Sequence, residues 1–167
     1  MMMLYLYYPQ FAAGEMRNLY LKQNSLDTSF LQKIWMDELL VNNFGACITF
    51  IGIVRKEENI DGLSFDIYEP LLKKWFREWS NKALSQNCNL FMAHSIGDVR
   101  VGEASFMCSL ISKNRKEPLS LYVDFIEDFK SSAPIWKYDL INGKRIYAKN
   151  RSKPLPFSGV LKTNKGD

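Results

Sequence analysis

The chain alternates short segments typical of β-strands with three longer segments that repeat apolar residues at helical spacing, and this alternation limits the possible folds most. The helical segments begin near Asp27, Pro70 and Pro118. Several strand-like segments follow one another with only a short turn between them, as neighbouring strands of an antiparallel sheet do. We therefore predict an α+β fold in which helices pack on one face of a largely antiparallel sheet, with a C-terminal hairpin as a subdomain.

Seven segments are expected to form strands. Their residues are 4–8, 46–55, 63–68, 90–96, 102–112, 135–141 and 145–148. The second of them is rich in β-branched and apolar residues and is expected to be a central strand, in which Gly52 marks a bulge or a close approach of the backbone. A turn around Asp98 is expected between the fourth and fifth strands. Asn142 and Gly143 favour a tight hairpin turn between the last two.

Each predicted helix has an apolar face that should be buried. In the first helix the face consists of Phe30, Leu31, Ile34, Trp35 and Leu39. In the second helix it consists of Leu71, Leu72, Trp75, Phe76, Trp79, Ala83 and Leu84. In the third helix, which is expected to end near Ser131 and Ser132, it consists of Leu119, Tyr122, Val123, Ile126 and Phe129.

The composition indicates one globular domain. The chain has 167 residues, of which 47% are hydrophobic and 14% aromatic, and this is enough to fill a core. We expect a single domain at residues 1–151 and a basic C-terminal tail at 152–167. No apolar run approaches the roughly 20 residues of a membrane-spanning helix. The N-terminal residues lack a basic leader and a cleavage site, so a cytoplasmic protein is expected.

The positive charge is concentrated at the C-terminal end of the chain. Residues 144–167 hold seven Lys or Arg and one acidic residue, which leaves 15 basic and 17 acidic residues in the rest. A basic tail can contact nucleic acid, an acidic partner protein or a phosphorylated substrate, and composition does not choose among these.

Two places outside the tail carry cations that could bind an anion. Arg55 closes an apolar strand, where it could bind phosphate or carboxylate with two hydrogen bonds. Asn114 and Arg115 lie between a strand and a helix, beside Lys113 and Lys116, where the N-terminus of the helix also favours anions. The alternative for both places is a cation that is simply solvated at the surface.

Lys130 and Lys137 lie seven residues apart, across a helix end and Pro134, which should turn the chain back towards the sheet. The residues between them look buried, so both ammonium groups could be partly desolvated. A partly desolvated lysine can give or take a proton near neutral pH. It also attracts an anion strongly, by about 4 kcal/mol at 4 Å in an effective dielectric of about 20. The alternative is that both stems lie along apolar surface with their charged ends in water.

The sequence indicates neither a metal site nor sulfur chemistry of its own. His94 is the only histidine, so a structural role is expected for it. Cys47, Cys88 and Cys108 lie 41 and 20 positions apart without a CxxC pair, so they are expected to be ordinary buried thiols. Any sulfur that such a protein transfers has to be brought from outside.

Several segments form an ordered set of motifs. Residues 45–55 read GACITFIGIVR, a glycine-alanine strand that ends in G-x-V-R. Residues 94–103 contain HSIG and then VGE. Residues 129–137 read FKSSAPIWK, which follows the pattern L-K-x-x-x-P-x-W-K with Phe in place of Leu. In this order and spacing the segments resemble the large, catalytic subunit family of molybdopterin synthase over about residues 44–151.

The resemblance implies an α/β-hammerhead-like fold and a sulfurtransferase that needs no cofactor or metal of its own. In this family a ubiquitin-like small subunit inserts a Gly-Gly tail ending in a thiocarboxylate, and cyclic pyranopterin monophosphate accepts two sulfurs in succession. It also implies a homodimer within a heterotetramer, with pockets built partly from the neighbouring chain, and no nucleic acid or membrane as a partner.

The resemblance implies roles for the cations identified above. Lys130 would neutralise and orient the thiocarboxylate, and Lys137 would give or take a proton at the pterin. Arg55 and Arg115 would hold the phosphate or the ring oxygens of the substrate. The other residues expected to bind substrate are Asn114, Tyr138, Asp139 and Arg151.

The chain departs from the family pattern in four places. Asn114 replaces a histidine, so it can hydrogen-bond but cannot titrate near pH 7. Asp139 is shorter than the acid that the family carries two places after the second lysine, and Ser95 replaces an arginine. The family's tail arginine has no clean counterpart, although Lys149 or Arg151 could substitute for it.

Two other functions stay open from the sequence. The first is a non-catalytic protein that binds the ubiquitin-like partner, in which Asn114 and Asp139 mark lost activity. The second is an RNA-binding module, since α+β sheets and basic tails occur in such proteins, although the exposed aromatic strand motif of the common RNA-binding sheets is missing.

Overall fold

The computed structural model describes residues 18–148, which form seven strands and three helices. In chain order these elements are β1 Leu19–Gln23, α1 Thr28–Val41, β2 Ala46–Ile53, β3 Gly62–Ile67, α2 Glu69–Ser85, β4 Cys88–Arg100, β5 Ala104–Ser112, α3 Lys116–Ser132, β6 Ile135–Ile141 and β7 Lys144–Tyr147. The predicted strand at residues 4–8, the boundary at 151 and the tail at 152–167 lie outside the described residues. Among residues 18–148 no helix is long and apolar enough to cross a membrane.

The strands form one largely antiparallel sheet, as predicted. Its order is β2-β5-β4-β3-β6-β7, and β1 pairs with β4 in the only parallel pairing among the described strands. Among the strands of residues 18–148, β2 therefore lies at the edge of the sheet, contrary to the prediction of a central strand at residues 46–55. β2 is rich in apolar residues because it packs against α3, although it pairs with β5 alone among the described strands. The bulge predicted at Gly52 is confirmed by a register shift between Gly52 and Ile53.

β4 is longer than expected because it changes partners along its length. Its first part, up to Ile96, pairs with β5 and β1, and its last four residues pair with β3. The change occurs at Gly97, whose φ of +76° is in the left-handed region that favours glycine. The turn predicted around Asp98 is therefore wrong: Asp98 pairs with Ser64, and the chain turns at residues 101–103 instead.

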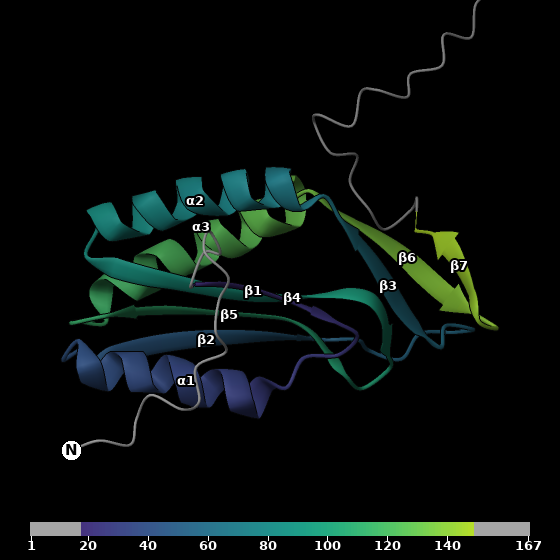
Figure 1. Cartoon of the computed structure of the whole chain (residues 1–167), viewed down its shortest axis with the longest axis horizontal. Coiled ribbons are helices and arrows are strands. Elements are labelled where there is room, and N and C mark those ends of the chain that lie inside the picture. Colours follow the sequence, from purple (N-terminus) through teal and green to yellow (C-terminus); the bar gives the residue numbers. More distant parts are fainter. Residues whose placement is uncertain (1–17, 149–167) are drawn as a thin grey trace, which may run out of the picture.

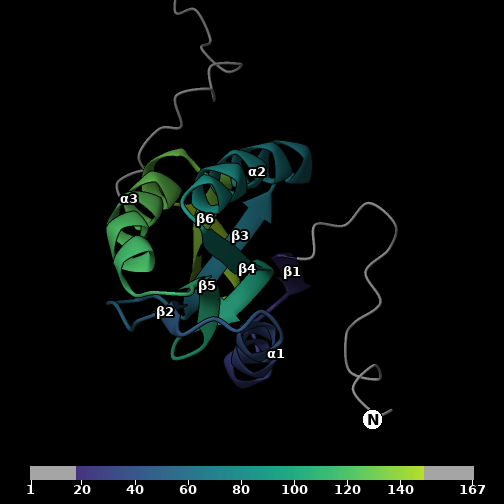
Figure 2. The ribbon, with the colours of Figure 1, turned by 90° about the vertical axis from the view of Figure 1, so that its left-hand side faces the viewer.

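The helices cover both faces of the sheet, not one. α2 and α3 lie together on one face, and α1 lies on the other (Figures 1 and 2). Alternate residues of β4 divide accordingly: Leu90 and Met92 belong to the core under α2 and α3, and Phe91 and Ala93 to the core under α1. Because helices cover both faces, every residue of β5 is buried. The predicted α+β class is confirmed, with α1 moved to the opposite face.

The predicted helices are confirmed, but their buried faces are shifted. The first helix begins near Asp27, as predicted, and Asp27 caps it: its Oδ1 accepts a hydrogen bond from the Phe30 N–H at 3.0 Å. In α3, Leu119 and Val123 are 56% and 59% exposed, contrary to the prediction. Ile126 is buried as predicted, and Leu121 and Phe125, which were not predicted, are buried as well. The reason is that α3 packs on α2 as well as on the sheet.

In α2, the two ends of the predicted apolar face are exposed. Leu71 is 46% and Leu84 58% exposed, while Leu72, Phe76 and Ala83 between them are buried. The helix thus covers the sheet with a narrower stripe than the one predicted.

The C-terminal hairpin forms as predicted. β6 pairs with β7 through Ile141 and Lys144, and the two residues between them have positive φ angles, 49° at Asn142 and 70° at Gly143. β6 also pairs with β3, so the hairpin extends the sheet beyond the part that the helices cover (Figure 1).

Candidate active site

Lys130 and Lys137 lie on either side of the junction between α3 and β6. Lys130 belongs to the last turn of α3, which ends at Ser132, and Lys137 is the third residue of β6. Between them Ala133 is buried and closes the turn: its N–H donates to the Phe129 carbonyl at 3.3 Å, and its carbonyl accepts from the Ile135 N–H at 2.8 Å. The structure therefore brings the two lysines to one corner of the molecule.

The two lysines differ in burial. Lys137 is half-buried, as expected, because it lies on a strand paired on both sides, opposite Phe65 of β3. Lys130 is exposed, so the expectation of partial desolvation is wrong for this lysine in a single chain. Lys130 lies in the last turn of α3, where the negative end of the helix dipole attracts a positive charge.

Asp139 joins this corner, whereas Tyr138 does not. Side chains of a strand alternate between faces, so Lys137 and Asp139 share the face of the sheet that carries their β3 partners, Phe65 and Leu63. Tyr138 is on the opposite face, where Arg145 lies 4.1 Å from the centre of its ring. Substrate binding by Tyr138 stays a prediction, and its side chain lies on the other face of β6 from Lys137.

The face that carries Tyr138 has its own polar cluster. Arg145 Nη2 donates to Asp66 Oδ1 at 2.6 Å, and the ring of Tyr147 lies edge-on to Tyr138 at 5.7 Å between centroids. Burial raises the pKa of Tyr138 above its ordinary value, and its hydrogen bond with Asp66 and the charge of that carboxylate raise it further. Tyr138 is thus held neutral as part of the hairpin.

Arg55 follows the end of β2 and points into solvent. Its side chain is 85% exposed, and its Nε donates to Glu57 Oε1 at 3.2 Å. A surface ion pair of this kind contributes little free energy, about 1 kcal/mol or less, so an anion could displace it. The structure places Arg55 as a solvated strand-end cation, the alternative left open above.

Asn114 and Arg115 lie at the N-terminal end of α3, far from Lys130. Both side chains are exposed, together with Lys113 and Lys116. The loop is held by Ser112, whose hydroxyl donates to the Asn114 carbonyl and accepts from the Asn114 N–H. At a rise of about 1.5 Å per residue, α3 separates Arg115 from Lys130 by roughly 22 Å. One chain therefore does not bring Arg115 to the two lysines.

His94 has the structural role expected of it. It is buried between the rings of Phe65, Phe106 and Phe129, and its Nδ1 is 2.8 Å from the Ser95 carbonyl. Burial lowers the pKa of His94 to about 4, so the imidazole is neutral at physiological pH. The described residues contain no cluster of His, Cys, Asp or Glu that could hold a metal ion.

The predictions for the three cysteines and for the tail cation have different outcomes. Cys88 and Cys108 are buried, and burial raises the pKa of Cys88 to about 11 and that of Cys108 to about 12, so both thiols stay protonated as expected. Cys47 is exposed, so the prediction that all three are buried is wrong for it. Lys149 and Arg151, the candidates for the tail cation, lie outside the described residues.

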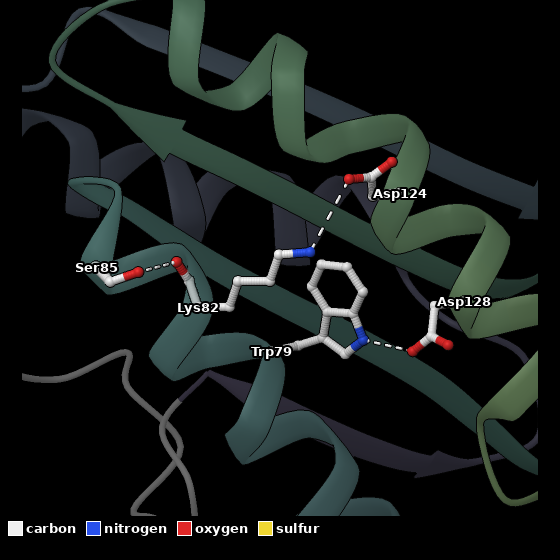
Figure 3. A network of polar contacts seen from close by, with 5 residues as sticks. All are labelled: Trp79, Lys82, Ser85, Asp124 and Asp128. Atoms are coloured by element: carbon white, nitrogen blue, oxygen red, sulfur yellow. Dashed lines mark hydrogen bonds and ion pairs between the residues drawn. The ribbon is translucent and has the colours of Figure 1, made fainter.

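Sequence reasoning missed the polar contacts between α2 and α3. Trp75 and Trp79 of α2 both hydrogen-bond to Asp128 of α3. Lys82 forms an ion pair with Asp124 at 3.9 Å, and Figure 3 shows this pair together with the Trp79 bond. The only signal in the sequence is that two tryptophans one helical turn apart face the same neighbour. That signal does not predict which side chain accepts the hydrogen bonds, because Asp128 lies about 50 residues further along the chain.

Comparison with known proteins identifies the family. The profile of the family described as MoaE protein matches residues 21–132. Two molybdopterin synthase catalytic subunits of Helicobacter pylori, from strains ATCC 700392 / 26695 and J99, are 60% and 48% identical to the chain, each over 83% of this chain and 96% of the relative.

A solved structure supports the same assignment. It is a complex of subunits 1 and 2 of molybdopterin-converting factor from Helicobacter pylori 26695, and one of its chains matches with a TM-score of 0.82 and 59% identity, over 86% of this chain and 98% of that one. These matches confirm the resemblance carried by the motifs. The chain belongs to the MoaE protein family.

Proposed function

We propose that the chain is the catalytic subunit of a molybdopterin synthase and that it acts as a sulfurtransferase. It transfers sulfur from the C-terminal thiocarboxylate of a ubiquitin-like small subunit to cyclic pyranopterin monophosphate, and this forms the dithiolene of molybdopterin. The proposal is supported by 60% identity to a relative named molybdopterin synthase catalytic subunit, of which the chain covers 96%. The similar structure is a complex of two subunits, which supports a small-subunit partner.

The observation that carries the proposal is the placement of Lys130 and Lys137 on the two elements that join at this corner, the last turn of α3 and the start of β6. Both reactants are anions, so a site that joins them must supply positive charge. Lys130, exposed at the end of its helix, is accessible to an incoming thiocarboxylate, which it neutralises and orients. Lys137 lies deeper on β6 and gives or takes the proton at the pterin. Asp139, on the same face, stays a candidate for orienting the substrate.

The remaining proposed substrate contacts require a second copy of the chain. Arg115 is roughly 22 Å from Lys130 along α3, so a pocket that holds both takes Arg115 from one chain and Lys130 from another. Edge strand β2 and the exposed Leu119 and Val123 leave the side of the molecule next to α3 open to a partner. We propose a homodimer within a heterotetramer, with Arg55, Asn114 and Arg115 binding substrate across the dimer and Arg151 as a candidate tail cation.

Substitution of the two lysines tests the proposal. Lys130→Ala and Lys137→Ala should each reduce dithiolene formation from cyclic pyranopterin monophosphate and a thiocarboxylated small subunit by a factor on the order of 1000. The matched control is Lys33→Ala, an exposed lysine on α1, which lies on the opposite face of the sheet, and this variant should retain full activity.

Three outcomes separate the possibilities. Full activity in both junction variants would refute the catalytic roles. A wild-type chain that binds the small subunit but forms no dithiolene would support the non-catalytic alternative, with Asn114 as its mark. Tighter binding to single-stranded RNA than to the pterin phosphate would support the RNA-binding alternative.

A cytoplasmic location, expected from the sequence, stays part of the proposal.

A further inference from the structure

One carboxylate oxygen joins the two helices above the sheet. Asp128 Oδ2 on α3 accepts hydrogen bonds from Trp75 Nε1 at 2.8 Å and from Trp79 Nε1 at 2.6 Å, both on α2 (Figure 3 shows the Trp79 bond). The two tryptophans are one helical turn apart, so both indoles reach the same acceptor. A carboxylate with two N–H donors is a charge-assisted pair of bonds, which is stronger and more directional than apolar contact.

The rings of the two tryptophans pack against α3 on both sides of Asp128. Phe125, one turn earlier, contacts Trp75 and Trp79 at 5.7 and 5.4 Å between ring centroids, and Phe129, the next residue, contacts Trp75 at 6.1 Å. The hydrogen bonds therefore fix how far α3 is shifted along α2. Apolar contacts are not directional, so alone they would allow several such shifts.

Asp128 is charged in this environment. Burial alone would raise the pKa of its carboxyl, but hydrogen bonds from Trp79, Ser132 and Trp75 and the charge of Lys82 together hold the pKa below its ordinary value. Lys82 itself lies 4.2 Å above the ring of Trp79 and pairs with Asp124 at 3.9 Å. Ser132 is the last residue of α3, so the contacts of Asp128 extend to the end of the helix.

The rotation of the helix connects Asp128 to Lys130. Successive residues of an α-helix are turned by about 100°, so Lys130 leaves the helix about 200° away from Asp128. Phe129, between them, stacks on Phe106 of β5 at 4.0 Å between ring centroids. With Asp128 fixed towards α2 and Phe129 fixed towards the sheet, the helix can present Lys130 in only one direction, away from α2.

We propose that Asp128, held by Trp75 and Trp79, is a positioning residue that sets the direction and height of Lys130 at the active site. The inference rests on the proposed function, because it assigns Asp128 no purpose in the reaction except through Lys130. A displacement of about 1 Å at a reacting group can cost up to 100-fold in rate, so a contact that fixes the last turn of α3 matters to catalysis without touching substrate.

Three variants test the proposal in the assembled enzyme, with thiocarboxylated small subunit and cyclic pyranopterin monophosphate. Asp128→Ala removes the acceptor, and we expect kcat to fall about 10-fold with KM for the pterin within twofold. Asp128→Asn keeps an acceptor oxygen of the same shape and should restore kcat to within about threefold of wild type. The double variant Trp75→Phe and Trp79→Phe keeps the rings and removes both donors, and should reproduce the Asp128→Ala loss.

The matched control is Asp124→Asn. Asp124 lies one turn before Asp128 on the same helix, pairs with Lys82, and is 67% exposed at its side chain. Its substitution should leave kcat and KM unchanged. The indole N–H resonances of Trp75 and Trp79 should shift upfield in Asp128→Ala and stay in place in Asp124→Asn, which reports the bonds directly.

A double-mutant comparison separates positioning from general damage. If Asp128 acts only through Lys130, adding Asp128→Ala to Lys130→Ala should cause no further loss in single-turnover rate. Losses that multiply would overturn the inference, as would wild-type kcat in both Asp128→Ala and the double Trp→Phe variant. If Asp128→Ala does not fold, the Trp→Phe pair decides the matter. Full activity in Lys130→Ala itself would instead refute the proposed function.

Discussion

At its C-terminal end helix α3 is held on two sides, whereas at its N-terminal end it begins in an exposed loop. Asp128 bonds to two tryptophans of α2, and Phe129 stacks on Phe106 over the buried His94. Arg115, at the other end, precedes a helix that has no side-chain cap. Both ends carry a cation assigned to the same reaction, but only the C-terminal end of the helix is fixed by contacts with other elements.

The difference fits the distinct tasks proposed for the two cations. A group that takes part in the chemistry must keep its position to within a fraction of an ångström, and packed elements provide this. A group that reaches into a neighbouring chain and holds a phosphate needs exposure first, and it becomes ordered when the other chain and the anion are present. Lys130 has the first environment and Arg115 the second.

Mixing two inactive variants is the strongest test of whether Arg115 and Lys130 act together from two different chains. Arg115→Ala and Lys130→Ala should each lose activity, by up to about 1000-fold for the lysine. After subunit exchange, each mixed dimer has one site with both substitutions and one intact site, so about a quarter of wild-type activity should return.

The control for this mixture uses two residues of the same corner. Lys130 and Lys137 belong to one chain at each site, so mixing Lys130→Ala with Lys137→Ala leaves no intact site and should restore nothing. Recovery in the control, or none in the first mixture, would show that Arg115 and Lys130 do not act across two chains.

Acid should weaken the support beneath the C-terminal end of α3. The pKa of His94 is about 4 in the folded chain because of burial, against an ordinary 6.5, so below pH 6.5 the unfolded chain binds a proton that the folded chain does not. The contribution of the neutral, buried His94 to the free energy of unfolding is intact above pH 6.5. It is lost as the pH falls from 6.5 to about 4, by about 3 kcal/mol in total. Urea unfolding at a series of pH values measures the slope, and His94→Gln should flatten it. An equal slope in that variant would contradict the assignment.

Truncation of apolar side chains at the two ends of α3 should have unequal costs. Phe129→Ala removes a half-buried ring stacked on Phe106 and should lower the free energy of unfolding by about 2 kcal/mol, less than for a fully buried ring. Leu119→Ala, at the exposed side of the first turns, should cost about 0.5 kcal/mol or less at concentrations below those at which the proposed dimer forms. Denaturant titration of the two variants compares them. Equal costs would mean that Leu119 is covered in solution.

The smallest expected effect concerns the exposed loop. Asn114→His introduces a group that titrates near pH 6.5, beside the cations proposed to bind the substrate phosphate. Below that pH the added charge should lower KM for cyclic pyranopterin monophosphate by about fivefold, which corresponds to about 1 kcal/mol for an exposed pair. The free energy of unfolding should stay the same. A change in kcat with unchanged KM would instead indicate that position 114 takes part in proton transfer.

Local patterns predicted those parts of the fold that depend on neighbouring residues. The start of α1 near Asp27, the hairpin at Asn142 and Gly143 and the bulge after Gly52 were predicted because their signals lie within a few residues. The edge position of β2 and the opposite placement of α1 depend on pairings between distant segments, which periodicity does not report. Similarly, Leu119 and Val123 fit an apolar helical face, and only the packing of α3 on α2 shows which side is covered.

The candidate site shows the same limit. The motif at residues 129–137 identified Lys130 and Lys137, and the helix–turn–strand at that point brings them to one corner. The motif alone did not show that Tyr138, next in sequence and also expected to bind substrate, lies on the opposite face of β6, which follows from strand alternation. The separation of Arg115 from Lys130 follows from the length of a single helix, and it could have been read from the sequence as roughly 22 Å had the rise of α3 been considered.

The change of partners along β4 has a mechanical consequence. One continuous backbone pairs with β5 and β1 before Gly97 and with β3 after it, so the hairpin region cannot hinge away from the helix-covered region without breaking that strand. The two regions should therefore open together, and the amides of Met92 and Val99, on either side of the glycine, should exchange with solvent at the same free energy as global unfolding.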